Sequence, residues 1–119
     1  PDFASLLKKF FKQQSKHQIS SASFGVAGPI QDQQCQATNL PWVIAAEELQ
    51  EQLNIPKVYL INDLEANAWG LRCLNEDEFF ILNVGKTALG NQALISAGTG
   101  LGEAGLYWDG KTHHPFACE

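Results

Sequence analysis

The chain has 119 residues, of which 45% are apolar and 18% charged, a composition typical of one globular domain. Eight Lys and Arg against thirteen Asp and Glu leave a net charge of −5, which argues against a nucleic-acid partner because such proteins present a basic surface. No apolar run approaches the roughly 18 residues of a membrane-spanning helix, so no membrane partner is expected. The three cysteines are odd in number and far apart, which disfavours a disulfide framework and favours the cytoplasm.

Periodicity and turn signals predict helices and strands in alternation. Asp2 is a candidate helix N-cap, because apolar residues recur after it at helical spacing. Asn54 to Pro56 is expected to end a later helix, and Asp109-Gly110 is a hairpin turn signal. In chain order we expect a helix after Asp2, strands over residues 21–27 and 35–39, a helix from Pro41 to residue 53, a strand over 57–61, a helix over 64–74, and strands over 79–82, 93–97 and 106–108. This order predicts one α/β domain with a mixed sheet and flanking helices.

Asn62 and Asp63 stand between an expected strand and an expected helix. Ligands of α/β sheets bind outside the carboxyl ends of the strands. A carboxylate there can accept the proton of a substrate hydroxyl, and the neighbouring amide can bond to further hydroxyls. Asn and Asp are also favoured helix N-caps, so the pair is compatible with a purely structural role.

A glycine-rich run at residues 98–105 literally contains G-x-G-x-x-G at Gly100, Gly102 and Gly105. The dinucleotide-binding motif requires a helix at its third glycine, whereas strand-like residues and a hairpin signal follow here. We therefore reject a dinucleotide-binding site and predict a glycine turn between two strands. Such a turn can bring backbone N–H groups close to a phosphate, with Thr99 adding a hydroxyl, or it can be a tight hairpin without a ligand.

Other motifs indicate ordinary structure. Gly85-Lys86-Thr87 imitates the end of a P-loop but lacks the earlier glycine, so a surface loop is expected. The spacing of His113, His114 and Cys118 fits no common zinc pattern, and no metal site is predicted. Cys35 and Cys73 are expected in the core. Thr38 and Asn39 precede Trp42, an expected core residue, and are either helix caps or contacts to a sugar.

Four segments occur in an order and spacing that resemble the bacterial glucokinase family of the hexokinase–actin–Hsp70 superfamily. They are Phe24-Gly25-Val26-Ala27-Gly28-Pro29-Ile30, Thr38-Asn39-Leu40-Pro41-Trp42, Ile61-Asn62-Asp63-Leu64 and Ala97-Gly98-Thr99-Gly100-Leu101-Gly102. The resemblance runs from about Ser23 to Glu119. It implies a partial ribonuclease H-like fold, of the actin-like ATPase and hexokinase type, and ATP-dependent phosphorylation of the 6-hydroxyl of glucose.

The resemblance also implies roles for single residues. Asp63 corresponds to the catalytic base and, together with Asn62 and Glu119, to a residue that binds the sugar. Thr38 and Asn39 lie where related kinases place polar sugar contacts. The second phosphate loop of the family corresponds to residues 98–102, with Gly98, Thr99, Gly100 and Gly102 as the expected ATP-binding residues. Mg²⁺ would be held mainly through the nucleotide phosphates, and a homodimer is compatible with the family.

Parts of the family pattern have no counterpart in this sequence. The first phosphate loop, Asp-Gly-Gly-Thr, is absent, and the sugar-binding segment is represented by its Glu alone. The chain also contains no Met and begins at Pro1. We therefore expect residues 1–119 to be a single partial domain, an internal piece of a longer protein, with weak or no activity alone.

Two other functions fit the same motifs. One is a sugar kinase of broader specificity from the related repressor/kinase family, which also carries Asn-Asp before a helix and a Gly-Thr-Gly loop. The runs Thr38 to Trp42 and Gly100 to Gly105 favour glucokinase over it. The other is a sugar sensor without catalysis, which could dispense with Asp63.

Overall fold

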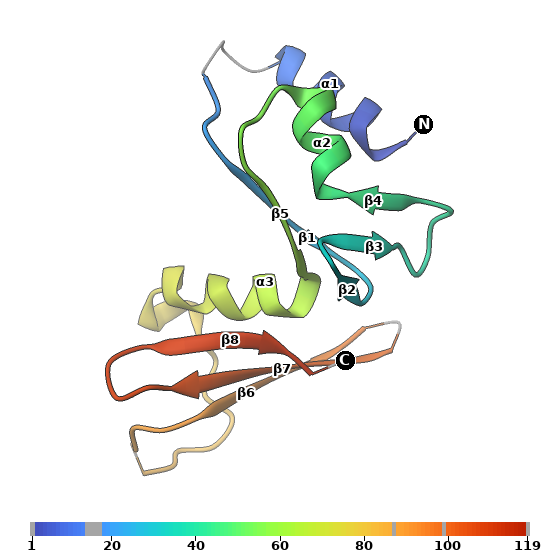
Figure 1. Cartoon of the computed structure of the whole chain (residues 1–119). Helices are drawn as coiled ribbons and strands as arrows, with labels where there is room; N and C mark the ends of the chain where they lie inside the picture. The colour runs from blue at the N-terminus through green and yellow to red at the C-terminus, as the bar shows by residue number, and fades with distance from the viewer. Residues whose placement is uncertain (1, 14–17, 87, 99, 119) are drawn as a thin grey trace. The chain divides into compact units, whose positions relative to one another are not determined.

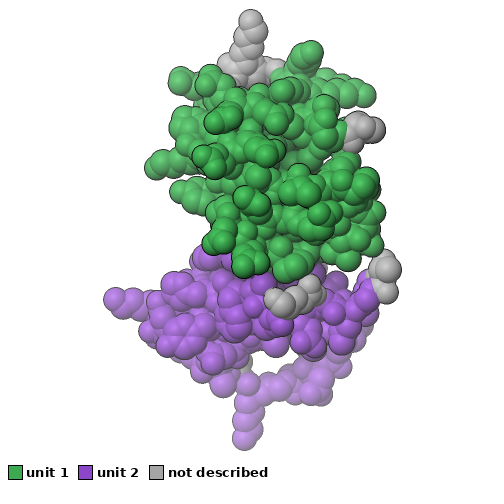
Figure 2. All heavy atoms as spheres, turned by 45° about the vertical axis from the view of Figure 1, so that its right-hand side comes forward, with its two compact units in different colours: residues 1–63 green, residues 64–119 purple. Residues whose placement is uncertain are grey.

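The computed structural model describes residues 2–13, 18–86, 88–98 and 100–118. The chain divides into two compact units, Pro1–Asp63 and Leu64–Glu119, which are coloured separately in Figure 2. Since compact units also occur within single domains, the assignment of residues 1–119 to one partial domain stays a prediction.

The first unit combines a parallel strand pair with a small antiparallel sheet. Its elements are α1 (Phe3–Gln13), β1 (Ala22–Val26), β2 (Ile30–Gln31), β3 (Gln34–Gln36), β4 (Val43–Ala45), α2 (Ala46–Leu53) and β5 (Val58–Asn62). Strands β1 and β5 run parallel, as Figure 1 shows, and Val26 pairs with Asn62 at their carboxyl ends. Strands β2, β3 and β4 form the antiparallel sheet in that order. The expected strands over 21–27 and 57–61 are thus confirmed with small shifts of their ends.

The core of the first unit lies where α1 and α2 pack together with the strands. Leu60 of β5 is 1% exposed, and Phe3 of α1 packs edge-on against Phe24 of β1. The predicted cap of α1 is confirmed, because the Ser5 N–H donates to Asp2 Oδ1 over 2.8 Å. This bond lowers the pKa of the Asp2 carboxyl. Helix α2 ends at Leu53, and Asn54 follows in the left-handed conformation, as the expected stop predicts.

The helix that was expected from Pro41 begins later. Val43–Ala45 forms β4, which pairs with β3, and α2 starts at Ala46. Two β-branched residues within β4 favour a strand, and pairing with β3 outweighs their helical spacing. The strand expected over residues 35–39 is Gln34–Gln36.

The second unit contains the rest of a helix and an antiparallel sheet. Its elements are α3 (Asp63–Gly70, which begins on the last residue of the first unit), two short 3-10 helices η1 (Leu71–Cys73) and η2 (Glu76–Glu78), and strands β6 (Gln92–Ala97), β7 (Leu101–Trp108) and β8 (His113–Ala117). The strand order is β6-β7-β8, with β7 in the centre. Leu64 and Ala68 of α3 pack against Ala104 and Leu106 of β7. The turn between β7 and β8 contains Asp109-Gly110, as predicted.

Two expectations for the second unit are wrong. Residues 79–82 form no strand, and the side chains of Phe80 and Leu82 are 88% and 90% exposed. A strand needs a partner for its backbone N–H and C=O groups, and none of the described strand pairings includes these residues. Cys73, which was expected in the core, lies exposed in η1. None of the helices formed by the described residues combines the length and the apolar character needed to cross a membrane.

Candidate functional site

The carboxyl ends of β1 and β5 bring together three segments of the first unit. Asn62, the last residue of β5, is 2% exposed, and its Nδ2 donates to the carbonyl oxygen of Gly28 over 3.4 Å. Gly28 lies two residues beyond the end of β1. Since parallel strands end at the same edge of a sheet, residues after β1 and residues at the end of β5 are neighbours there. This edge is the position at which the sequence predicted a ligand site.

Thr38 closes the loop after β3 onto the same edge. Its N–H and its Oγ1 both donate to the carbonyl oxygen of Ala27, over 3.2 and 3.3 Å. Thr38 and Asn39 are both exposed. The hydroxyl of Thr38 is therefore used as a donor within the protein, while its oxygen retains the capacity of a hydroxyl to accept.

Gly28 is packed so closely that a side chain has no room. Its φ is +142°, and a Cβ would lie 2.9 Å from both Cys35 Sγ and the Gln36 carbonyl oxygen. The thiol of Cys35 is buried, as expected. The sequence indicated a turn at Gly28, but the requirement for glycine comes from β3, which packs against it and is not apparent from the local pattern.

Asp63 follows Asn62 directly and is the first residue of α3. Its side chain is half-buried. Burial raises the pKa of the Cys35 thiol, and the negative charge of Asp63 raises it further. Because Asp63 directly follows Asn62, the last residue of β5, the predicted base lies at this same edge of the strand pair.

Gln33 is a residue of this unit that the sequence interpretation missed. Its side-chain Oε1 accepts from the Leu60 N–H over 2.8 Å, and its Nε2 donates to the Leu60 carbonyl oxygen over 3.4 Å. Leu60 precedes Asn62 by two residues on β5. No local signal reveals a side-chain bond across 27 residues of sequence.

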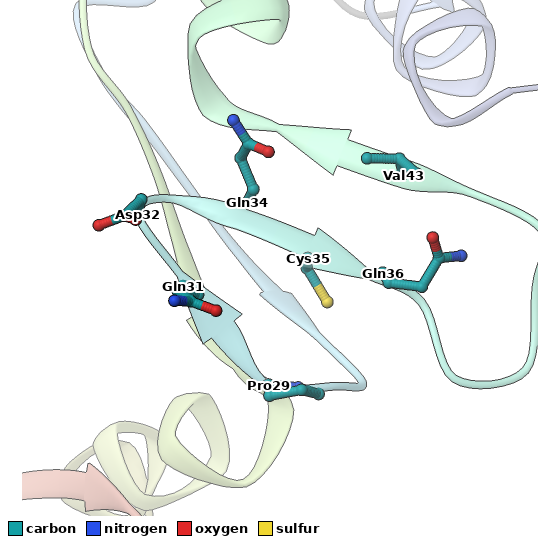
Figure 3. Close-up of a pocket in the computed structure, with 7 residues that line it drawn as sticks. All are labelled: Pro29, Gln31, Asp32, Gln34, Cys35, Gln36 and Val43. Atoms are coloured by element: carbon teal, nitrogen blue, oxygen red, sulfur yellow. The ribbon is translucent and has the colours of Figure 1, made fainter.

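An open pocket lies beside the turn between β2 and β3, and Figure 3 shows its lining. The residues that line it are Pro29, Gln31, Asp32, Gln34, Cys35, Gln36 and Val43. None of the predicted site residues is among them, so this pocket gives no support to a sugar site.

The glycine run of the second unit forms the predicted turn between two strands. The Gly98 N–H donates to the Gly100 carbonyl oxygen over 2.9 Å, and Ala97 pairs with Leu101 directly after it. Gly98 and Gly100 are exposed, and a Cβ at either would meet no atom within 4 Å. Gly102 and Gly105 belong to β7, which confirms that no helix follows the motif and that the dinucleotide-binding interpretation fails. Thr99 and Glu119 lie outside the described residues. In the segment that imitates a P-loop, Gly85 and Lys86 are exposed, and Thr87 also lies outside the described residues.

The sequence model of the glucokinase family matches residues 1–119. The chain belongs to the glucokinase family. It is 36% identical over 123 residues to a glucokinase of Nostoc punctiforme, and the match covers the whole of this chain and 35% of that protein. A glucokinase of Allorhizobium ampelinum is 38% identical over 101 residues, which cover 84% of this chain and 29% of the relative. The chain therefore spans about a third of the length of the curated glucokinases that it matches.

A solved glucokinase has the same fold. The crystal structure of glucokinase from an Antarctic psychrotroph matches with a TM-score of 0.84 over 99% of this chain and 37% of that chain, at 24% sequence identity. The likeness confirms the expected fold class, an α/β arrangement that corresponds to part of a glucokinase fold. The parallel pair β1–β5 and the antiparallel sheets supply the two kinds of strand pairing that the prediction of a mixed α/β fold contained.

Proposed function

We propose that the natural polypeptide containing these residues phosphorylates glucose at the expense of ATP, with Asp63 as the general base. Membership of the glucokinase family carries this proposal. The Asp63 carboxylate takes the proton of the 6-hydroxyl, a bond forms between that oxygen and the γ-phosphorus, and the bond from the γ-phosphorus to the bridging oxygen breaks. ADP leaves with the electron pair of the broken bond. Phosphoryl transfer of this kind depends on positioning and on stabilisation of charge.

The sugar-binding part of the proposal rests on the edge formed by β1 and β5. Asn62 is buried, so a sugar hydroxyl that bonds to its amide would also be removed from water and held firmly. Thr38, which bonds to Ala27, and the next residue, Asn39, are both exposed and can bond to further hydroxyls. Glu119 completes the proposed set by resemblance to the family.

The phosphate-binding part rests on the turn at Gly98 and Gly100. Open space around both glycines lets a phosphate approach the backbone, and Gly102 holds the start of β7 beside Ser96. Thr99 is proposed as a hydroxyl donor to the same phosphates. We propose that these residues bind the phosphates of ATP.

In the proposed reaction, Mg²⁺ binds together with the nucleotide. Within the described part of the chain, no three His, Cys, Asp or Glu side chains are grouped so that they could hold a metal ion. We propose that the phosphates of ATP are the main ligands of the ion. Homodimer formation and a cytoplasmic location also remain predictions.

The proposal is tested with the natural polypeptide, expressed at its native length. Formation of glucose 6-phosphate from glucose and Mg-ATP is measured in a coupled assay, and binding of labelled glucose by equilibrium dialysis. We expect Asp63→Asn to lower kcat by at least about 10²-fold, the scale of general-base catalysis, with glucose binding nearly unchanged. Glu51→Gln, a change on the exposed side of α2, is the matched control and should leave both unchanged.

Each part of the proposal can fail separately. A natural polypeptide that does not phosphorylate glucose contradicts the proposed activity. Full turnover by Asp63→Asn contradicts the assignment of the base and leaves the activity standing. Loss of glucose binding in Asp63→Asn would mean that Asp63 holds the sugar in place, with no evidence of a role as base.

A further inference from the structure

Gln33 occupies a tight turn in a backbone conformation that glutamine rarely adopts. Asp32 and Gln33 connect β2 to β3, and their φ angles are +49° and +58°. Two-residue hairpin turns with positive φ at both positions strongly favour Asn, Asp and Gly. Asp32 fits that preference and Gln33 does not. A residue held in an unfavourable conformation invites the question of what its side chain does.

The side chain of Gln33 imitates a strand on the edge of β5. Its amide accepts from the N–H of Leu60 and donates to the carbonyl of the same residue, over 2.8 and 3.4 Å. Among the described residues, β1 is the only partner strand of β5. The amide of Gln33 therefore satisfies two backbone groups that would otherwise need another strand or water, at a residue that is 1% exposed.

The backbone of Gln33 holds a third element. Its carbonyl oxygen accepts from the Ala46 N–H over 3.0 Å, and Ala46 is the first residue of α2. The N-cap residue of α2, Ala45, provides no side-chain bond, so the Gln33 carbonyl takes over part of the capping. One residue thus joins the β2–β3 turn to the start of α2 and to the middle of β5.

We propose that Gln33 is a positioning residue for the reaction described above, on which this inference rests. Its amide fixes β5 at Leu60, two residues before Asn62 and three before Asp63, and so sets the position of the base at the strand end. Loss of the amide frees the edge of β5 without touching the substrate sites. Small displacements of a base cost rate rather than ground-state binding.

The first measurement is amide exchange, which needs no activity. Exchange of the Leu60 N–H is followed by NMR in the natural polypeptide and in Gln33→Gly, which removes the amide and also relaxes the backbone. We expect exchange to become about ten-fold faster, as for the loss of one ordinary hydrogen bond. Gln34→Ala, an exposed neighbour on β3, is the matched control and should leave the Leu60 exchange unchanged.

The second measurement separates positioning from stability. Each variant is assayed well below its own unfolding temperature, so that all of it is folded. Gln33→Gly should lower kcat about ten-fold while KM for glucose stays within about two-fold. If Gln33→Gly does not fold, Gln33→Asn serves the same test, because asparagine suits the positive φ and its amide, one methylene shorter, is withdrawn from the Leu60 N–H.

The outcomes distinguish this inference from the proposed function. Unchanged exchange at Leu60 overturns the role of Gln33 whatever the activity. Faster exchange with unchanged kcat shows a structural contact alone and also overturns it. If the natural polypeptide lacks glucose phosphorylation altogether, the proposed function fails and the catalytic role of Gln33 falls with it, while faster Leu60 exchange would still show that Gln33 holds β5.

Discussion

Replacing Gly28 by Ala should destabilise the first unit more than any ordinary surface substitution. Gly28 has a φ of +142°, which L-amino acids rarely adopt. A new Cβ would lie 2.9 Å from Cys35 Sγ, 2.9 Å from the Gln36 carbonyl oxygen and 3.4 Å from Thr38 Oγ1. The Gln36 oxygen belongs to β3 and cannot move without that strand. The Gly28 carbonyl is also the acceptor of the buried Asn62 amide, so any shift of this turn is transmitted to Asn62.

The expected loss of stability is the sum of backbone strain and steric overpacking at Gly28. Backbone strain at such a φ is about 1–3 kcal/mol, and overpacking against fixed neighbours costs about 1–3 kcal/mol more. Together they amount to about 2–6 kcal/mol, a large part of the roughly 5–15 kcal/mol that stabilises a typical domain. For a chain of this size, each kcal/mol of lost unfolding free energy lowers the unfolding midpoint by about 4 °C, so the midpoint should fall by at least about 8 °C.

Thermal unfolding followed by circular dichroism tests this prediction against a matched control. Gly85→Ala introduces the same methyl group at an exposed glycine where no atom lies within 4 Å. It should leave the midpoint within about 2 °C, as most surface substitutions do. In the double variant with Cys35→Ala one of the two closest contacts is removed, so the combined loss should be smaller than the sum of the single losses. Equal midpoints for Gly28→Ala and Gly85→Ala would refute the reasoning.

Two further predictions concern ionisable groups. The N–H of Thr112, then His114 and the N–H of Lys111, lower the pKa of Asp109 from 3.8 to about 2. Because the folded pKa lies below the unfolded one, this stabilisation is present above pH 3.8 and lost as the pH falls through about 2. Asp109→Asn should therefore show a weaker loss of stability across that range, and an unchanged acid unfolding curve would contradict the assignment. Burial, and then the charge of Asp63, raises the pKa of the Cys35 thiol, whereas Cys73 and Cys118 are exposed. Mass spectrometry after brief alkylation should find Cys35 unmodified in the folded chain, and labelling of Cys35 as fast as Cys73 would argue against its burial.

The parts of the fold that were predictable from the sequence are those fixed by local patterns. The cap at Asp2, the stop at Asn54 and the turn at Asp109 each follow from the preference of one or two residues. The strand before Asn62 was predictable because a short apolar run stands between two turn signals. The glycine turn after β6 was predictable because the residues that follow it favour a strand.

The missed elements depend on partners distant in the sequence. Residues 43–45 carry apolar side chains at a spacing that suits a helix, but pairing with β3 makes them β4. Residues 79–82 have a composition typical of a strand, but none of the described strands pairs with them, and they do not form a strand. Local propensity is a weak guide wherever pairing or packing with a distant segment decides the outcome.

In the candidate site, the residues proposed to react were predictable from the sequence, whereas the residues that hold them in place were not. Asp63 and Asn62 could be proposed from sequence because their chemistry is carried by their own side chains. Gln33 could not, because its role lies in two bonds to the backbone of Leu60. The sequence predicted a turn at Gly28, but the requirement for glycine at this position arises from the close approach of Cys35 and Gln36. A base at a strand end is only as well placed as the strand, so under the proposed mechanism we expect substitutions at the residues that fix β5 and the β1 turn to lower the rate as substitutions at the proposed sugar contacts do.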